Sequence, residues 1–304
     1  MTYSRFSFLL ASALLLSAAC SERGSARRGA GTSPDASGTL DSGLSDADGP
    51  DAPARPDATP MVEDVLVYSH SPEQLYSFNP ETLRVTEIGS FRTAGGMTVG
   101  PMIDLAVNSL GEIYTTSAES LFRVNPETAV AEPVGSGLGL DRDEQLVALT
   151  FLTAGTLMAG VEDLIGATSG GSYYRLNTTT GAPTRLGNFP SGWRASGDLV
   201  SVERLGTYAT LRTEANDGDT LARIDFAADG SSSVSVIGRV TVDGMPVLRI
   251  FGLAYWGRTV YGFTNDGWLI SIDRDTGAAS RVSVDTGAEQ FWGAGVSTKA
   301  PVLI

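Results

Sequence analysis

One short pattern recurs five times along this chain, and it constrains the fold more than any other feature of the sequence. Each copy has apolar residues at its first, second and fourth positions and Asn or Asp at its fifth. The second and fourth side chains therefore lie on one face of a strand. The Asn or Asp predicts a turn directly after it, because its side chain can bond the backbone two residues further on. The copies begin at Leu75, Leu121, Tyr173, Leu221 and Leu269.

The copies start 46 to 52 positions apart. A period of about 40 to 50 residues is typical of propeller blades with four strands each. Most of the turns are followed by an extended run that ends in Gly, which predicts a hairpin. These runs are residues 85–89, 131–135, 184–187 and 234–238.

Runs that contain small residues come before the hairpins, and small side chains suit innermost strands that crowd around an axis. We expect inner strands at residues 103–107, 146–151, 197–202, 250–255 and 291–297. A turn and a second short strand follow the first four runs, as in residues 157–159 after Gly155. Four strands per unit result.

The last inner run has no hairpin after it, and the first unit, which starts near Val65, has no inner run before it. We therefore expect an all-β chain, a β-propeller of five four-stranded blades, in which the C-terminal strand completes the first blade. Such closure removes exposed strand edges. A ring of six blades and an open array are the alternatives.

The repeat also resembles a broad bacterial β-propeller repeat of the form apolar-Tyr-x-apolar-Asp-x-x-Thr-Gly, over about residues 63 to 300. The resemblance implies the fold. It does not imply one activity, since propellers of this kind include binding proteins, assembly scaffolds and hydrolases.

The N-terminus predicts export. Residues 1–19 contain one charge, Arg5, and a short apolar run, as in a signal peptide. The segment from Leu16 to Cys20, Leu-Ser-Ala-Ala-Cys, resembles the lipobox of bacterial lipoproteins, although Ser17 stands where that family prefers Leu. This resemblance implies that Cys20 is lipidated and anchors the protein to a membrane. An ordinary signal peptide is the alternative.

Residues 20–61 hold the cysteine and a segment of Ser, Gly, Ala, Pro, Arg and Asp. Such a composition cannot bury enough surface to offset ordering entropy, so we expect a tether before a propeller domain at 62–304. The protein would face the periplasm or the cell surface, and Ser21 favours the outer membrane. Cys20 is the only cysteine, which excludes an internal disulfide.

Two carboxylates are candidates for a central site. Aligning the inner runs places Asp104 and Asp198 in one column, in blades two steps apart. They could form a polar-ligand or cation site, or an acid/base pair. Alternatively, each carboxylate bonds backbone amides and orients a neighbouring blade. The only histidine, His70, is expected at the surface or in a hairpin.

Other candidates are weaker. Residues 214–219 predict an acidic hairpin tip at which Asp217 and Asp219 could bind calcium, or a plain turn; we expect no other cofactor. The aromatic residues Trp193, Tyr255, Trp256 and Trp292 lie near the ends of inner strands. They could stack on sugars or on a partner's side chains, or pack between blades.

The net charge of −14 argues against nucleic-acid binding. We expect a monomer that binds a protein or glycan partner on the cell envelope. No nucleophile and base system is recognisable, so a non-catalytic role is favoured. The alternative is an envelope hydrolase or lyase that acts on a sugar or lactone through Asp104 and Asp198.

Overall fold

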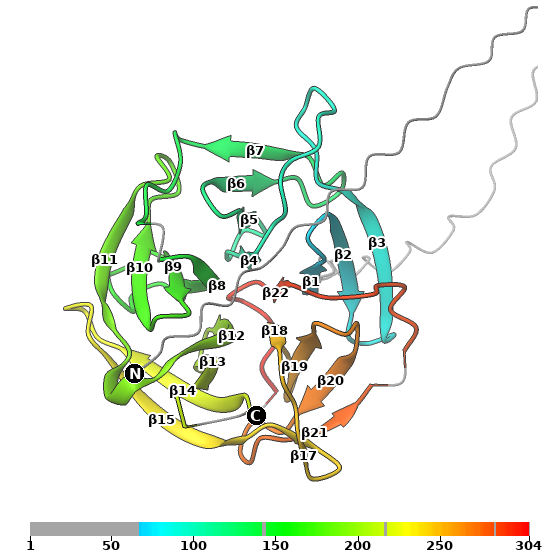
Figure 1. Ribbon diagram of the computed structural model, residues 1–304, viewed down its shortest axis with the longest axis vertical. Helices are drawn as coiled ribbons and strands as arrows, with labels where there is room; N and C mark the ends of the chain where they lie inside the picture. The colour runs from blue at the N-terminus through cyan, green and yellow to red at the C-terminus, as the bar shows by residue number, and fades with distance from the viewer. Residues whose placement is uncertain (1–66, 142–143, 216–217, 283, 304) are drawn as a thin grey trace, which may run out of the picture. The chain divides into compact units, whose positions relative to one another are not determined.

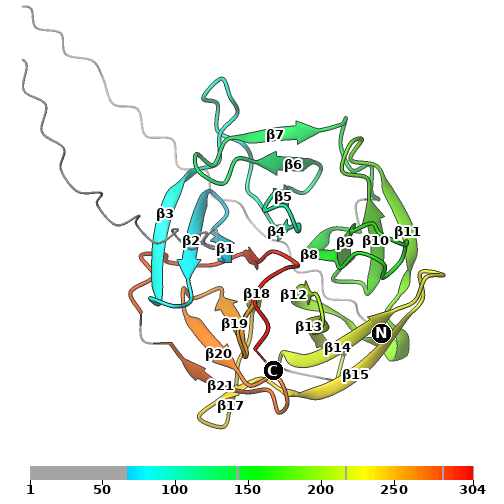
Figure 2. The same cartoon turned by 180° about the vertical axis from the view of Figure 1, so that it is seen from behind.

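A computed structural model describes residues 67–141, 144–215, 218–282 and 284–303. Five sheets, each built on four antiparallel strands, stand in a ring around a central axis, with one strand of each sheet nearest the axis (Figures 1 and 2). The expected five-bladed propeller is confirmed. The predictions of a signal peptide, of lipidation at Cys20 and of a tether concern residues outside the described ranges.

The first three blades run from the innermost to the outermost strand as follows. Blade 1 contains β22 (Gly293–Gly295), β1 (Val67–His70), β2 (Gln74–Asn79) and β3 (Arg84–Ser90). Blade 2 contains β4 (Asp104–Val107), β5 (Ile113–Thr116), β6 (Leu121–Val124) and β7 (Ala131–Val134). Blade 3 contains β8 (Leu146–Leu152), β9 (Asp163–Thr168), β10 (Ser172–Leu176) and β11 (Pro183–Asn188).

A single 3-10 turn, η1 (Pro190–Gly192), leads into blade 4. Blade 4 contains β12 (Arg194–Val202), β13 (Gly206–Arg212), β14 (Thr220–Phe226) and β15 (Ser232–Arg239). Blade 5 contains β18 (Ile250–Trp256), β19 (Thr259–Thr264), β20 (Leu269–Ile272) and β21 (Ala278–Arg281). A small hairpin of β16 (Thr241–Val242) and β17 (Met245–Pro246), which the repeat did not predict, adds to the outer edge of blade 5.

The ring closes as predicted, through the C-terminal strand. β22 pairs antiparallel with β1 and brings Gly293 opposite His70 and Gly295 opposite Tyr68. The inner edge of blade 1 is thereby covered by a segment more than 200 residues away in the chain. Closure of this kind leaves no free inner edge for pairing with another chain.

The five repeat copies form the third strand of each blade, and the turn after them has the expected origin in four cases. Asn79 Oδ1 accepts the amide hydrogens of Glu81 and Thr82 at 2.9 and 3.0 Å. The equivalent side chains of Asn125, Asn177 and Asp273 do the same. Each turn is therefore held by a side chain that the repeat supplies.

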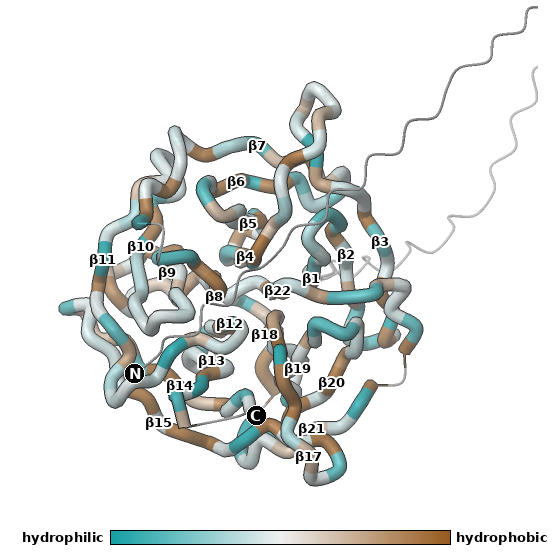
Figure 3. Tube along the Cα trace, in the orientation of Figure 1, coloured by the Kyte–Doolittle hydropathy of each residue, from teal (hydrophilic) through white to brown (hydrophobic). Residues whose placement is uncertain are grey.

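Apolar side chains fill the space between adjacent sheets. Hydrophobic segments occur in every blade, as the brown stretches of Figure 3 show. Aromatic rings join blades 1 and 5: Phe78 meets Phe263 edge to face at 6.0 Å, and Phe263 meets Phe291 at 5.2 Å. Such pairs add to the stabilisation from burial, so the closing blade is packed as well as hydrogen-bonded.

One strand prediction was wrong. The second strand of blade 3 is β9 (Asp163–Thr168), whereas residues 157–159 lie in a loop. Gly155 and Gly160 have positive φ values of 91° and 72°, which turn the chain twice before the strand begins. Among the described residues, no helix is long and apolar enough to cross a membrane.

Candidate functional site

The two central carboxylates are buried and bond backbone amides. Asp104 Oδ1 accepts from the amide of Leu105 at 2.8 Å, and its Oδ2 accepts from Leu149 in blade 3 at 2.6 Å. Asp198 repeats the arrangement with Leu199 at 2.6 Å and with Leu253 in blade 5 at 2.7 Å. Each carboxylate thus ties its own inner strand to that of the next blade.

The two groups also influence each other's ionisation. Burial and the neighbouring charge of Asp198 raise the pKa of Asp104 well above its usual range. Burial likewise raises the pKa of Asp198, although the amides of Leu253 and Leu199 oppose the rise. Two buried carboxylates within reach of each other do not both ionise readily, so the pair holds a proton to a higher pH than an ordinary Asp.

His70 lies at the end of β1, next to the turn of the β1–β2 hairpin, as one of the two expectations has it, but the expectation of a surface position is wrong, because the imidazole is completely buried. Its Nδ1 donates to the Ser71 carbonyl at 2.7 Å. Its Nε2 has no hydrogen-bond partner among the described residues. Burial lowers the pKa of His70 to about 4, so the ring is neutral at physiological pH.

Gly293 explains how these groups come together. A Cβ at this position would lie 2.2 Å from Asp104 Oδ1 and 2.5 Å from His70 Nε2, distances that no side chain can occupy. The carboxylate and the imidazole therefore border the same point, next to the backbone of the closing strand. His70 belongs to the centre because β1 is the neighbour of β22 and not an outer strand.

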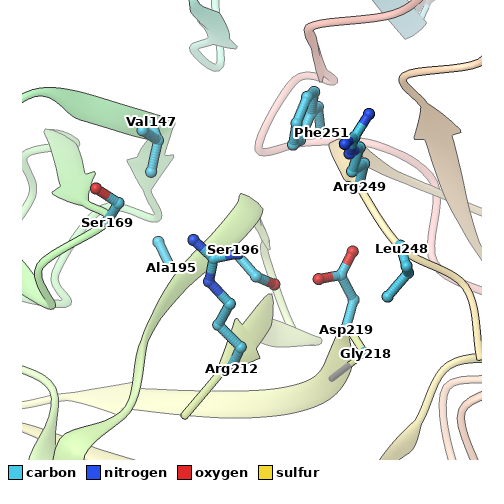
Figure 4. Close-up of a pocket in the computed structure, with 10 residues that line it drawn as sticks. All are labelled: Val147, Ser169, Ala195, Ser196, Arg212, Gly218, Asp219, Leu248, Arg249 and Phe251. Carbon is cyan, nitrogen blue, oxygen red and sulfur yellow. The ribbon is translucent and has the colours of Figure 1, made fainter. Parts of the chain in front are cut away.

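A pocket of about 440 Å³ opens where the inner strands of blades 3, 4 and 5 begin. Its lining comes from the starts of β8, β12 and β18, from the end of β13 and from the segments before β14 and β18. Figure 4 shows Arg212 and Asp219 entering from below, and Phe251 and Arg249 from the upper right. Six residues carry its chemistry: Val147, Ser196, Arg212, Asp219, Arg249 and Phe251.

Asp219 holds the segment that carries Arg249. Its Oδ2 accepts the amide hydrogen of Ile250 at 2.8 Å, and its own amide donates to the Val247 carbonyl at 3.2 Å. Asp219 is only 4% exposed, and burial raises its pKa, against the opposing effect of the Ile250 amide. It is therefore a buried clamp and not part of an exposed hairpin tip.

The described residues give little support to the expected calcium site at Asp217 and Asp219. Asp217 lies outside the described ranges, and Asp219 is committed to backbone amides. Within the described ranges, no group of three or more His, Cys, Asp or Glu residues is placed to hold a metal ion. Calcium binding stays a prediction.

The two pocket arginines are exposed and have no ion pair with the residues that the structure describes. Arg212 lies directly opposite Arg194 across the β12–β13 ladder. Arg194 bonds Glu214 at 2.9 Å, whereas Arg212 has no ion pair among the described residues and acts on Asp219 only at longer range, where its charge opposes the rise that burial causes in the pKa of that carboxyl. Like charges that face each other across strands repel, and the pairing of Arg194 with Glu214 offsets part of that repulsion.

The predicted aromatic residues do not line this pocket. Tyr255 is fully buried; its hydroxyl donates to the Gly257 carbonyl at 2.8 Å and accepts from Arg274 at 3.0 Å. Trp193 and Trp256 are half-buried and pack against core clusters. Trp292 is half-buried, and its Nε1 donates to Gln290 at 3.0 Å. Packing between blades describes most of this set better than an exposed aromatic face does.

Sequence reasoning missed Arg212, Arg249 and Phe251. Phe251 is the second residue of a predicted inner strand, and the alternation along that strand could have placed it towards the pocket. The arginines carry no comparable signal, because they lie at a strand end and in a loop. These residues come together only because the blades close into a ring.

No protein-family model and no curated protein matches this chain. Solved structures resemble its fold. The structure of U3-55K has a TM-score of 0.41 and 13% identity, over 75% of this chain and 65% of that one, slightly less than two thirds. The nidogen/laminin complex has a TM-score of 0.48 and 11% identity, over 76% and 97%. A gluconolactonase from Xanthomonas campestris has a TM-score of 0.41 and 12% identity, over 68% and 67%.

Proposed function

We propose that this protein is an envelope-anchored β-propeller that binds a protein or glycan partner through the face on which the pocket opens. One observation carries the proposal: Arg212 and Arg249 stand exposed at a concave site without ion-pair partners among the described residues. Unpaired cations at a pocket of this size suit a partner that bears an anionic group. Two cations without ion-pair partners are less expected in a chain with a net charge of −14 than in a neutral or basic one.

The central groups support binding over catalysis. Asp104 and Asp198 each give both oxygens to backbone amides, and neither lines the pocket. A general acid or base must come within hydrogen-bond reach of the reacting group. Asp104 and Asp198, which the alternative enzymatic function requires, are therefore already hydrogen-bonded to backbone amides.

The proposed location rests on the N-terminal sequence. Lipidation of Cys20 would hold the protein on the membrane, and residues 21–61 would let the propeller reach a partner at a distance. Cys20→Ala should move the full chain from the membrane fraction to the soluble exported fraction. Unchanged membrane association of the variant would contradict lipid anchoring.

The binding role is tested by capture from envelope extracts with the full chain. Arg212→Glu with Arg249→Glu should abolish capture, because the reversed charges repel an anionic partner. Arg204→Glu is the matched control, since Arg204 is also exposed and, like Arg249, has a positive φ, of 67° against 61°. It lies in the turn before β13, whereas Arg212 ends that strand. Equal capture by all three proteins would overturn the proposal, as would turnover of a sugar lactone by the wild type.

A further inference from the structure

The rim and the floor of the pocket on blades 3 to 5 have different chemistry. We call the exposed lining residues Arg212 and Arg249 the rim and the buried lining residues Ser196 and Asp219 the floor. Guanidinium groups form strong, paired hydrogen bonds with carboxylates. An anionic group of a ligand therefore fits at the rim, where it also relieves the repulsion between Arg212 and Arg194.

The floor carries a carboxylate and a hydroxyl. Figure 4 shows the Ser196 hydroxyl directed towards the Asp219 carboxylate. Ser196 Oγ is buried and has no hydrogen bond of normal geometry among the described residues, but it lies near enough to the carboxylate to oppose the rise that burial causes in the pKa of Asp219; the hydroxyl can still accept a hydrogen bond from a ligand. Asp219 uses Oδ2 for the Ile250 amide, and a carboxylate can accept further donors.

This combination selects among anionic ligands. A compact anion that filled the pocket would meet the Asp219 carboxylate and be repelled. A ligand that keeps its anionic group at the rim and presents hydroxyl groups to the floor avoids that conflict, since hydroxyls both donate to a carboxylate and accept from Ser196. The selected chemistry is a polyhydroxylated carboxylate.

The remaining wall is apolar. Val147 and the ring of Phe251 line it, and Phe251 is half-buried. Aromatic rings supply a flat apolar surface in binding sites, and the C–H faces of a pyranose ring are apolar too. The volume of about 440 Å³ lies in the range of small-molecule sites.

We propose that the pocket binds a sugar acid unit. Its carboxylate lies between Arg212 and Arg249, its hydroxyl groups bond Ser196 and Asp219, and its ring packs on Phe251. The inference rests on the proposed binding function and names the ligand class. The unit can be a free monosaccharide or part of an acidic glycan, and the chemistry at the pocket is the same.

Calorimetric titration of the full chain tests this. D-Glucuronate should bind, whereas D-glucose, which lacks the carboxylate, and acetate, which lacks the hydroxyls, should bind at least about tenfold more weakly. Arg212→Ala and Arg249→Ala should each weaken glucuronate binding about tenfold or more, and Arg204→Ala should leave it unchanged. Acidic oligosaccharides of galacturonate separate the sources: tighter binding than the monosaccharide identifies a glycan, and equal binding identifies the free acid.

Three results would overturn the inference: no heat of binding with glucuronate or the oligosaccharides, equal affinity for acetate and glucuronate, or equal affinity of wild type and Arg212→Ala. Capture of an envelope partner that depends on the arginines, without any sugar-acid binding, would leave the binding function standing and remove the ligand class. Sugar-acid binding that depends on the arginines, without captured partners, supports the ligand class and removes only the scaffolding role.

Discussion

The centre of the propeller and the pocket on its face both contain charged side chains, but they use them differently. Asp104 and Asp198 are almost completely withdrawn from water, and every carboxylate oxygen accepts a backbone amide. Arg212 and Arg249 are exposed and lack ion pairs among the described residues. Buried carboxyl groups whose oxygens all accept backbone amides join the blades, whereas unpaired charge at a concave surface is available to a ligand. Burial and bonding together thus separate structural charge from functional charge in this molecule.

The largest expected effect lies at the centre. Asp198→Ala leaves the buried amides of Leu199 and Leu253 without acceptors, and each unsatisfied group costs about 1–3 kcal/mol. We expect a loss of about 3–5 kcal/mol in the free energy of unfolding, measured with urea. Asp198→Asn keeps one acceptor and should lose less.

Asp225→Ala is the control for this change, since Asp225 is an exposed strand residue whose one ion pair among the described residues is with Arg223, at 3.3 Å. It should change stability by less than about 0.5 kcal/mol. Similar losses for Asp198→Ala and Asp225→Ala would mean that the central carboxylates do not join the blades.

His70 should make the centre sensitive to acid. Its folded-state pKa of about 4 lies below its ordinary value of 6.5, so the unfolded chain binds the proton first. The stability that comes from the neutral ring is present above pH 6.5 and is lost as the pH falls towards 4, by roughly 3 kcal/mol in total. Asp104 and Asp198 act with the opposite sign: their raised pKa values favour the folded state as the pH falls, and that contribution is lost as the pH rises through them.

A comparison with His70→Asn isolates the histidine, because both carboxylates are present in both proteins. The amide nitrogen of Asn can still donate to the Ser71 carbonyl but does not titrate. The difference in unfolding free energy between wild type and variant should therefore shrink between pH 6.5 and 4. A constant difference over that range would show that the imidazole is not buried in its neutral form.

The contrast between the two regions also decides what could be predicted from sequence. Most strands and the ring closure follow from a repeat whose copies can be aligned, and the alignment places Asp104 and Asp198 in equivalent positions without choosing between amide binding and a ligand site. The predicted closure pairs β1 with β22, but it does not show which side chains of β1 face inwards, so the burial of His70 was missed. The pocket could not be predicted either, since Arg212, Asp219 and Arg249 come from non-repeating segments at strand ends, where single charged residues resemble ordinary solvated surface.

An intermediate effect is expected at Asp219, which is buried like the central pair but serves the pocket. Asp219→Ala removes the acceptor of the Ile250 amide, at a cost of about 2 kcal/mol. Because the segment with Arg249 loses its clamp, glucuronate affinity should fall as well. Urea unfolding and calorimetry on the same protein separate the two losses. Full retention of affinity would mean that Asp219 does not position Arg249.

The smallest effect is the sharpest test, because its sign differs from that of the others. Arg212 faces Arg194 across the ladder and has no ion pair among the residues that the structure describes. Opposed like charges cost about 0.2–1 kcal/mol, of which the Arg194–Glu214 pair offsets a part. Arg212→Thr should therefore leave the ligand-free protein as stable as wild type or more stable by a few tenths of a kcal/mol, while sugar-acid binding is lost. The gain should shrink as salt is added, since screening weakens repulsion between exposed charges. A stability loss at low salt would mean that Arg212 supports the fold, and would place it with the charges at the centre. A gain together with lost binding would show a side chain kept for its ligand at the expense of stability, as expected of functional sites.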